Sequence, residues 1–435
     1  MATSHEPFVV VVGAGPSGLL LALLLARRGV PVQLIDLANE EDDQPRATHY
    51  GPPAVYELER AGVLDDVRAE GFLPSGVAWR AFDLSVIAEL DATVLEDYPH
   101  RMVCLPLNRL SKILVKHLEN STSATIHWQH KVLSLGQDDD SAWVQVDTPA
   151  GLKTISAPYI VGCDGANSQI RRSLFGQWEF PGTTWKEQVV ATNIYYDFYK
   201  YGLGDANFIV DRENWYMASR ITNDGLWRVT YGDVPGHTTE ELRARLPEKF
   251  RTMLPGNPGP DDYKLANFSP YKVHQRLAKK MRVGRFCLAA DAAHLCNPFG
   301  GLGLTGGMVD VGGLYDCLAG IFEGKADDSI LDKYDEVRRT KYSEIINPVS
   351  TENFKRVFDQ TANEARERDD FLILCKTLAD DPQKSKEFQM GANAIQHDFT
   401  QYYNEAETLK EGRSPNGPVK GTAASRMVTA MGVTD

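Results

Sequence analysis

The feature that most constrains this chain is a glycine-rich turn between an apolar strand and an apolar helix, close to the N-terminus. Residues 8–12 are Phe-Val-Val-Val-Val, a run typical of a parallel strand that is buried on both faces. Residues 19–28 are rich in leucine and alanine and predict a helix. This order of strand, turn and helix is typical of a nucleotide-binding α/β unit. The turn consists of Gly13, Ala14, Gly15, Pro16, Ser17 and Gly18.

Each glycine of this turn has a separate physical task. Gly13 permits the tight turn, Gly15 lets the backbone approach a pyrophosphate, and Gly18 lets the helix pack close to the strand. The N-terminus of the helix presents free N–H groups and a partial positive charge to the phosphates. A second strand over residues 32–36 ends in Asp36, whose carboxylate can hydrogen-bond a ribose hydroxyl. The sequence therefore predicts a dinucleotide site, which fits NAD and FAD equally well.

Composition argues against several classes of protein. The chain has 435 residues, of which 43% are apolar and 24% charged, as is typical of a soluble globular protein with two lobes. Its net charge of −13 argues against nucleic acid or an anionic membrane surface as the main partner. No apolar run is long enough to span a membrane, and the six cysteines include no C-x-x-C pair. We therefore expect reduced thiols, a cytoplasmic location and, from base rates, a homodimer.

Two regions of different pattern predict the organisation of the chain. Strand and helix patterns alternate in the first part, whereas residues 183–270 are crowded with aromatic residues that alternate as in antiparallel strands. We predict an α/β fold in which a Rossmann-like domain with a parallel sheet is joined to a mostly antiparallel substrate domain and to C-terminal helices. The expected ranges are 1–75, 101–182 and 271–345 for the nucleotide-binding domain, 76–100 and 183–270 for the substrate domain, 346–411 for the helices and 412–435 for a flexible tail.

Two further blocks place an acidic residue directly after a buried strand. Asp164 follows the apolar residues 159–163, and the carboxyl edge of a parallel sheet is where ligands bind in such folds. An Asp-Gly pair is by itself also typical of a simple turn. Asp291 follows the apolar residues 286–290 and precedes a loop rich in proline and glycine, with a helix expected from about Met308. The glycines of this loop leave backbone N–H groups free to approach a ligand.

Together the three blocks resemble those of the single-component flavin-dependent aromatic hydroxylases, the para-hydroxybenzoate hydroxylase-like monooxygenases. The resemblance extends over most of residues 8–345. This chain departs from the usual family pattern at Ala290, where the family has glycine, at Thr305, where it often has asparagine, and at Asp36, where it more often has glutamate. The blocks are Gly13-x-Gly15-x-x-Gly18, Cys163-Asp164-Gly165 and Ala290-Asp291-Ala292-Ala293-His294-x-x-x-Pro298-x-x-Gly301-x-Gly303.

The resemblance implies FAD as the cofactor, with NAD(P)H and O₂ as co-substrates. In this family NAD(P)H reduces FAD, O₂ adds at the flavin C4a position, and the hydroperoxide transfers a hydroxyl group to a phenolic or other electron-rich aromatic substrate. It also implies that the segment after Asp164 lies on the route of NAD(P)H. The cofactor-binding residues implied are Gly13, Gly15, Pro16, Ser17, Gly18, Asp36, Arg46, Asn108, Asp164, Asp291, Pro298, Gly301, Gly303 and Leu304.

Four residues are candidates for a part in the reaction itself. Pro298 opens the loop that is expected to pass over the flavin ring, where backbone N–H groups can offset negative charge. Tyr216 and His274 are candidates for activating a phenolic substrate, and Arg276 for lining its pocket. The alternative for these three is a structural polar residue, which is favoured for Tyr216. His294 is expected to have a capping or packing role.

Other functions remain compatible with parts of this pattern. The same scaffold supports epoxidation, Baeyer–Villiger oxygen insertion and oxidative decarboxylation, and a flavin-binding protein without catalysis is an alternative of another class. An NAD-dependent dehydrogenase follows from the first block alone, but the blocks around Asp164 and Asp291 disfavour it. A basic run over residues 279–285 can favour the extra phosphate of NADPH, or can be a solvated turn.

Overall fold

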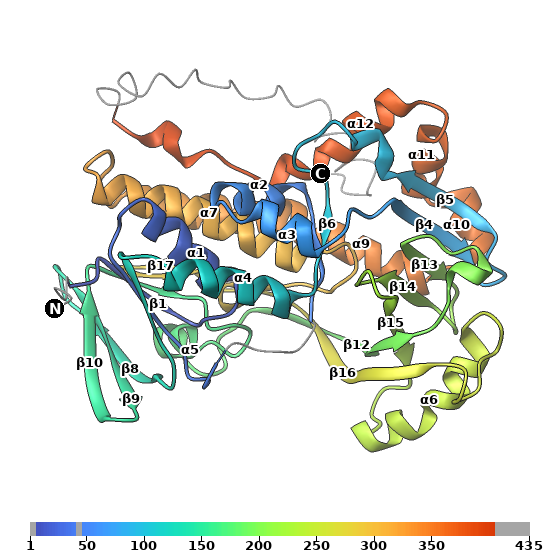
Figure 1. Cartoon of the computed structure of the whole chain (residues 1–435), viewed down its shortest axis with the longest axis horizontal. Coiled ribbons are helices and arrows are strands. Elements are labelled where there is room, and N and C mark those ends of the chain that lie inside the picture. Colours follow the sequence, from blue (N-terminus) through green and yellow to red (C-terminus); the bar gives the residue numbers. More distant parts are fainter. Residues whose placement is uncertain (1–5, 41–45, 405–435) are drawn as a thin grey trace.

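Two sheets lie side by side in the computed structural model, which describes residues 6–40 and 46–404 (Figure 1). A six-stranded sheet, parallel except at one edge, carries the glycine-rich turn, and an eight-stranded, mostly antiparallel sheet stands next to it. The predicted fold class is thereby confirmed. The expected tail, 412–435, and the end of the expected helical region, 405–411, lie outside the described residues.

The six-stranded sheet has the order β17-β18-β11-β1-β2-β7, so that β1 is central. β1 pairs in parallel with β2 on one side and β11 on the other, and its four valines are buried. Three antiparallel strands form a separate small sheet in the order β10-β9-β8. The bounds are β1 Val9–Val12, β2 Val32–Ile35, β7 Ala124–His127, β8 Lys131–Gln137, β9 Ala142–Thr148, β10 Gly151–Ala157, β11 Tyr159–Gly162, β17 Arg282–Val283 and β18 Phe286–Leu288.

The helices of this part cover the six-stranded sheet because their apolar faces need burial. α1 is buried along almost its whole length and packs against α4 and α7. α7 can also pack closely, because its glycines leave its surface flat against α2 and the C-terminal segment. The bounds are α1 Pro16–Arg27, α2 Pro52–Arg60, α3 Leu64–Glu70, α4 Leu107–Glu119, α5 Gln169–Phe175 and α7 Leu302–Phe322.

The eight-stranded sheet has the order β19-β16-β12-β15-β14-β13-β4-β5. Its one parallel pair joins β13 to β4, a strand from much earlier in the chain. Aromatic and aliphatic side chains on one face of the sheet pack under α6, Thr239–Met253, a helix that the sequence pattern did not predict. The bounds are β4 Gly76–Ala81, β5 Val86–Asp91, β12 Gly182–Tyr195, β13 Ala206–Val210, β14 Tyr216–Arg220, β15 Leu226–Asp233, β16 Lys264–Leu277 and β19 His294–Leu295; β3 His49–Tyr50 and β6 Val103–Cys104 form a separate pair.

Helices follow α7 to the end of the described chain, as predicted. α8 packs against α7 and β17, whereas α11 packs against β5 and is followed by α12 (Figure 1). The described residues contain no helix that is long and apolar enough to cross a membrane. The bounds are α8 Ile330–Lys341, α9 Asn347–Phe358, α10 Ala362–Arg368, α11 Asp370–Leu378 and α12 Pro382–Met390.

Candidate active site

A cavity of about 1390 Å³ lies between the two sheets. At one end it is lined by the glycine-rich turn and the loops that follow the strands of the six-stranded sheet, and at the other by one face of the eight-stranded sheet and by α11 and α12. Fourteen residues were expected to bind the cofactor, and all except Gly18 line this cavity. Parallel strands place their carboxyl ends at one edge, which is why motifs far apart in the sequence meet here.

The glycine-rich turn has the geometry that the motif predicts. At Gly13, which has φ +105°, a Cβ would lie 2.5 Å from the carbonyl oxygen of Cys163, and at Gly18 a Cβ would lie 1.9 Å from the carbonyl oxygen of Gly13. A Cβ at Gly15 would meet no protein atom within 4 Å, so the space in front of this residue is open. Gly15 caps α1, and Pro16 is its first residue, so the N–H groups of the first turn face the cavity.

Asp36 stands directly after β2, at the carboxyl edge of the sheet. One carboxylate oxygen accepts a hydrogen bond from the N–H of Ala14 at 2.6 Å, and the other accepts from the N–H of Ala38 at 2.7 Å. The side chain therefore braces the glycine-rich turn and also borders the cavity. Carboxylate oxygens can accept further hydrogen bonds, so a ribose hydroxyl can still be held here.

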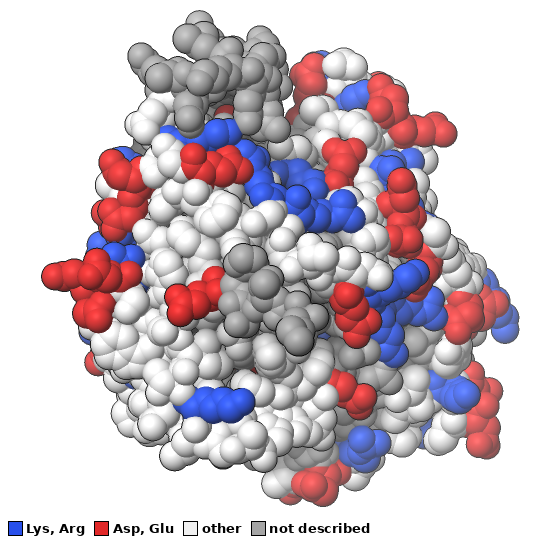
Figure 2. All heavy atoms as spheres, turned by 60° about the vertical axis from the view of Figure 1, so that its left-hand side comes forward, with Lys and Arg blue, Asp and Glu red and all other residues white. Residues whose placement is uncertain are grey.

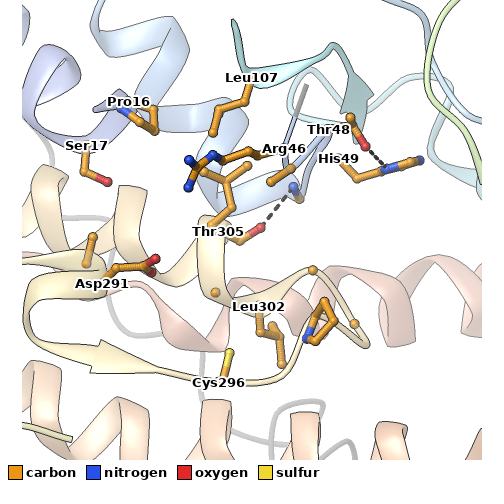
Figure 3. A pocket seen from close by; sticks show the side chains of 18 of the residues that line it. Pro16, Ser17, Arg46, Thr48, His49, Leu107, Asp291, Cys296, Leu302 and Thr305 are labelled. Atoms are coloured by element: carbon orange, nitrogen blue, oxygen red, sulfur yellow. Dashed lines mark hydrogen bonds between the residues drawn. The ribbon is translucent and has the colours of Figure 1, made fainter. Parts of the chain in front are cut away.

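Arg46 reaches into the cavity from the opposite side (Figure 3). In this view its guanidinium lies below Pro16 and Leu107 and above Thr305 of α7, and Asp291 lies lower and to the left. Asn108, in the first turn of α4, lines the same region. A guanidinium group in this place can neutralise phosphate groups of a bound dinucleotide.

The side chain of Asp164 makes more hydrogen bonds within the protein than the motif suggests. Its carboxylate accepts hydrogen bonds from the hydroxyl of Ser168 at 2.5 Å and from the N–H groups of Gln169 and Ile170 at 2.6 and 3.1 Å. Burial raises the pKa of Asp164, although these hydrogen bonds counteract the effect. Asp164 thus fixes the N-terminus of α5, while Gly165 beside it faces open space at the cavity.

Asp291 lies in a short 3₁₀ turn, Ala290–Ala292, directly after β18. Its side chain is exposed to the cavity although protein surrounds it. Burial raises the pKa of Asp291, and electrostatic interactions with His294 and Arg46 partly offset this. Asp291 therefore presents its carboxyl group to the cavity.

A buried carboxylate holds the turn of Asp291 in place. Asp310 on α7 accepts hydrogen bonds from the N–H of Ala290 at 3.0 Å, from His294 Nε2 at 2.6 Å and from Arg338 Nε at 2.7 Å. Burial alone would raise the pKa of Asp310, but its interactions and hydrogen bonds with His294 and Arg338 hold the pKa below its usual value. His294 also packs against the ring of Tyr342, which agrees with the packing role expected for it.

Asn297 holds the loop after Asp291 in place through hydrogen bonds. Its N–H donates to Gln275 Oε1 at 2.6 Å, its amide donates to the carbonyl oxygen of Ser350 at 2.7 Å, and its side-chain oxygen accepts from the N–H of Phe299 at 3.0 Å. Pro298 between these anchors lines the cavity. The loop is therefore rigid enough to place a ring above it.

α7 begins at Leu302, half a dozen residues earlier than the sequence predicts, because Gly301 already caps the helix with φ +67°. Gly301, Gly303 and Leu304 all line the cavity, so the unpaired N–H groups of the first turn face it. Thr305 lies in the same turn, and its hydroxyl accepts a hydrogen bond from the N–H of Gly51 at 3.3 Å (Figure 3). This contact gives Thr305 a structural role that ties α7 to α2.

Ala290 has a strained backbone, with φ +55°, where the family usually has glycine. A left-handed conformation costs an L-residue about 1–2 kcal/mol. We expect Ala290→Gly to be at least as stable as the unmodified protein. The adjacent Ala289 has φ −140°, so Ala289→Gly should instead lose about 0.5–1 kcal/mol through chain entropy. Thermal unfolding of both variants tests this, and a lower midpoint for Ala290→Gly than for Ala289→Gly would contradict it.

The eight-stranded sheet presents polar side chains to the cavity that the sequence analysis did not single out. Arg228 on β15 donates a hydrogen bond to Asn193 Oδ1 at 3.1 Å and another to the main-chain carbonyl of Arg46. Burial lowers the pKa of Arg228 to about 10, so that it stays positively charged at neutral pH. Tyr271 on β16 lies near this guanidinium, and burial raises the pKa of its hydroxyl. Strand alternation is the signal that could have identified them, since Arg228 and Thr230 interrupt an apolar strand on one face.

His49 on β3 also lines the cavity. Its Nδ1 is 2.9 Å from the hydroxyl of Thr48 (Figure 3). Burial and the nearby charge of Arg228 lower the pKa of His49 to about 4, so the imidazole is neutral at physiological pH. No sequence motif pointed to this histidine.

The basic run over residues 279–285 is neutralised within the protein. Its lysines and one arginine form ion pairs with nearby acids, and Arg285 donates to main-chain carbonyl groups. Figure 2 shows basic and acidic side chains next to one another at the top and right of the drawn face, and mostly neutral residues elsewhere. This run is therefore a paired surface turn rather than a phosphate site. The pairs are Lys279–Glu179, Lys280–Asp335, Arg282–Asp328 and Arg282–Asp332.

Comparison with known proteins decides the family. The model of the FAD binding domain family matches residues 6–347. A para-nitrophenol 4-monooxygenase of Pseudomonas sp. strain WBC-3 is 39% identical over 349 residues, which is 80% of this chain and 86% of that protein. This chain belongs to the single-component FAD-dependent aromatic hydroxylases.

Other relatives of this hydroxylase agree. The 6-hydroxy-3-succinoylpyridine 3-monooxygenase of Pseudomonas putida strain S16 is 36% identical, over 83% of this chain and 92% of that protein. The crystal structure of p-nitrophenol 4-monooxygenase from Pseudomonas putida DLL-E4 superposes with a TM-score of 0.84 at 38% identity, over 90% of this chain and 98% of the other. An aklavinone-11 hydroxylase complex with FAD, at 23% identity and TM-score 0.72, shares the fold.

FAD fits the residues of this hydroxylase. The open space at Gly15 and the first turn of α1 suit a pyrophosphate, and Asp36 and Asp291 also line the cavity. Arg46 supplies a positive charge that acts on Asp291. The predicted cofactor is therefore consistent with the donor groups that the cavity presents.

Three of the four catalytic candidates lie away from the cavity of the hydroxylase; only Pro298 lines it. Tyr216 points to the opposite face of the sheet, into the core under α6. His274 Nδ1 forms a hydrogen bond with the hydroxyl of Thr184 at 2.9 Å. Arg276 lines a separate surface hollow and donates hydrogen bonds to the hydroxyl of Thr184 and to the carbonyl oxygen of Phe180. All three therefore lie outside the cavity lining, as expected of structural polar residues.

Proposed function

We propose that this hydroxylase inserts a hydroxyl group into a small phenolic ring, or a ring of similar electron density, with NAD(P)H and O₂ as co-substrates. The observation that carries this proposal is one continuous cavity. It begins at a nucleotide cradle and ends at a sheet face with a charged guanidinium and aromatic side chains. The names of the two relatives described above, which act on a nitrophenol and a hydroxypyridine, support a small hydroxylated ring.

In this proposal Asp36 holds a ribose, the first turn of α1 holds the pyrophosphate, and Asp291 holds the ribityl part of FAD. The first turn of α7 and the loop at Pro298 face the flavin ring, where their N–H groups stabilise negative charge. When bound, FAD accepts electrons from NAD(P)H and activates O₂ for transfer of one oxygen atom to the substrate. The protein around it must exclude water, which the enclosing walls from both sheets and the C-terminal helices favour.

Arg228 is the group best placed to activate a phenol. A positive charge near a phenolic hydroxyl favours the phenolate, which is a better nucleophile than the phenol. The neutral ring of His49 and the hydroxyl of Tyr271 line the same region and can hydrogen-bond an oxygen of the substrate. We therefore assign substrate activation to Arg228 in place of Tyr216 and His274.

Replacing Arg228 by methionine removes this charge and keeps most of the side-chain volume. The pKa of the bound phenol should then rise, and the ascending limb of the kcat–pH profile should move to higher pH by about one unit, equivalent to about 1.4 kcal/mol. Because Arg228 also holds the carbonyl of Arg46, flavin content is measured alongside as a control. An unshifted profile with full flavin content would contradict the assignment.

Tyr216 on β14 and Tyr271 on β16 form a matched pair for a test of this placement. The hydroxyl of Tyr216 is buried, has no hydrogen-bond partner within the described residues and lies outside the cavity, so Tyr216→Phe should leave turnover unchanged. Tyr271 lines the cavity, and Tyr271→Phe should lower kcat/KM by about five- to tenfold, the effect of one hydrogen bond. Steady-state kinetics on one phenol compares them, and the reverse order of effects would refute the placement.

The function is tested with purified protein by its absorption spectrum and by NAD(P)H oxidation across a panel of phenols and hydroxypyridines. The proposal predicts a flavin spectrum, oxidation stimulated by particular aromatic compounds, and an equivalent amount of hydroxylated product. A flavin-loaded protein whose NAD(P)H oxidation no aromatic compound stimulates would instead support a non-catalytic flavoprotein.

A further inference from the structure

The part of the cavity lined by β4, β13, α11 and α12 presents aromatic rings. Trp79 on β4, Phe208 on β13, Phe371 on α11 and Phe388 on α12 all line it. We call these four residues the aromatic wall. They come from three separate stretches of the chain and meet only because β13 pairs with β4 and the C-terminal helices pack on β5.

We propose that the aromatic wall binds the apolar part of the substrate and sets the largest ring substituent that the enzyme accepts. The inference rests on the proposed function and adds the residues that select the substrate. The substrate expected for such a pocket is apolar at one end and polar or anionic at the other.

The rings of the wall pack as aromatic side chains do in a rigid core. Trp79 and Phe208 are stacked, with centroids 5.8 Å apart and an interplanar angle of 17°. Trp79 and Phe371 meet edge to face at 5.2 Å and 80°, and Phe371 and Phe388 lie 6.1 Å apart. These arrangements are favourable in themselves, so the wall is formed without a ligand.

Phe371 also packs against charged groups that do not line the cavity. The guanidinium of Arg356 stacks on its ring at 4.2 Å and is paired with Asp369 at 3.0 Å. Asp369 also caps α11 by accepting a hydrogen bond from the N–H of Leu372 at 3.2 Å. Phe371 is only 4% exposed, and these contacts fix its ring as a stop rather than a mobile side chain.

The wall adjoins the loop assigned to the flavin ring. Leu302, the first residue of α7, packs against the cluster that contains Trp79, Phe371 and Phe388. Phe299 in the same loop lies 6.2 Å from Phe208, centroid to centroid. A ring bound against the wall is therefore close to the place where oxygen transfer would occur.

The sheet face changes from polar to aromatic across neighbouring strands. In one row Thr230 stands opposite Met217, Met217 opposite Phe208, and Phe208 beside Trp79. In the next row Arg228 stands between Asn193 and Ser219. Side chains on one face of neighbouring strands form such rows, so a bound molecule meets Arg228 at one end and the aromatic wall at the other.

Half of the wall lies outside the residues that match the family model. That match ends at residue 347, whereas Phe371 and Phe388 follow it. Substrate selection in this chain is thus assigned partly to helices that are not part of the matched FAD binding domain. The face of the eight-stranded sheet supplies the remainder.

Truncation of Phe371 tests the inference. Phe371→Ala should raise the ratio of kcat/KM for para-propylphenol to that for phenol by at least about tenfold, since one methylene group in a fitted pocket changes selectivity about 10- to 200-fold. Leu378→Ala is the matched control, because Leu378 lies on the same helix and in the same cluster but does not line the cavity. Its ratio should stay unchanged. Phe388→Leu provides a second, milder variant if Phe371→Ala does not fold.

Calorimetric binding of the same two phenols to the FAD-loaded variants separates this inference from the proposed function. A shift of binding preference towards para-propylphenol in Phe371→Ala or Phe388→Leu supports the wall, even if no variant forms product, in which case only the proposed function fails. Product formation with the same size preference in all variants overturns the wall alone. An equal shift in Leu378→Ala also overturns it, because the effect would then be one of general packing.

Discussion

Asp291→Ala is expected to purify without its flavin. The carboxylate is surrounded by protein yet open to the cavity, between the first turns of α1 and α7. Each hydrogen bond to a charged group contributes about 1.5–3 kcal/mol, so the loss of one such bond should raise the Kd for FAD by about 10- to 150-fold. Flavin absorbance after purification and a fluorescence titration of the apoprotein with FAD measure the effect.

An exposed acid that is distant from the cavity provides the control for this prediction. Asp332→Ala removes a carboxylate that pairs with Arg282 on the surface, and its FAD affinity should equal that of the unmodified protein. If Asp291→Ala kept its full flavin content and the same turnover, the assignment of the third sequence block to FAD binding would be wrong.

Asp310→Ala is expected to have the largest effect on stability. This carboxylate is fully buried and satisfies both His294 and Arg338 as well as the N–H of Ala290. Its removal leaves the buried guanidinium of Arg338 without its ion-pair partner, which costs about 3–5 kcal/mol in comparable cases. Denaturant unfolding at neutral pH measures the loss, and a change below about 1 kcal/mol would contradict the account.

The same carboxylate gives a pH dependence of known sign. The folded-state pKa of Asp310 is lowered, so its contribution to stability is present above the unfolded-state pKa of about 4. That contribution is lost as the pH falls through the lower folded-state value. The difference in unfolding free energy between the unmodified protein and Asp310→Ala should therefore shrink below about pH 4. If this difference in unfolding free energy stayed constant down to pH 2, the ionised carboxylate of Asp310 would not be the source of the stabilisation.

Local motifs could be interpreted from the sequence because their physics is local. The strand, the turn around Gly13 and the acid at position 36 lie within one βαβ unit, and each has the expected geometry. The carboxyl ends of parallel strands meet at one edge, so the distant blocks at Asp164 and Asp291 could also be placed near the same ligand.

Side-chain direction on the second sheet could not be predicted in this way. Tyr216 and Met217 are neighbours in sequence, yet one lies under α6 and the other in the cavity. Aromatic residues occur on both faces of these strands, so alternation alone does not show which face meets the cofactor. Packing of α6 determines which face is covered, and the capping box of Thr238 and Glu241 marks the start of this helix in the sequence.

Contacts between residues that are far apart in the sequence explain the other differences between the prediction and the structure. In the sequence Arg228 is only a single charged residue within an apolar strand. Its hydrogen-bond partner, the main-chain carbonyl of Arg46, is far away in the sequence. The strain at Ala290 likewise depends on Asp310, which holds the N–H of that residue from α7. Such features follow from tertiary contacts rather than from local propensity.

The most direct test of oxygen transfer is the fate of isotopically labelled O₂ in turnover with NAD(P)H and a phenol that stimulates oxidation. The account predicts a hydroxylated product that carries one labelled oxygen atom, in an amount close to that of the NAD(P)H consumed. Consumption of NAD(P)H that yields only hydrogen peroxide with every phenol tested, or a product whose new oxygen comes from water, would contradict it.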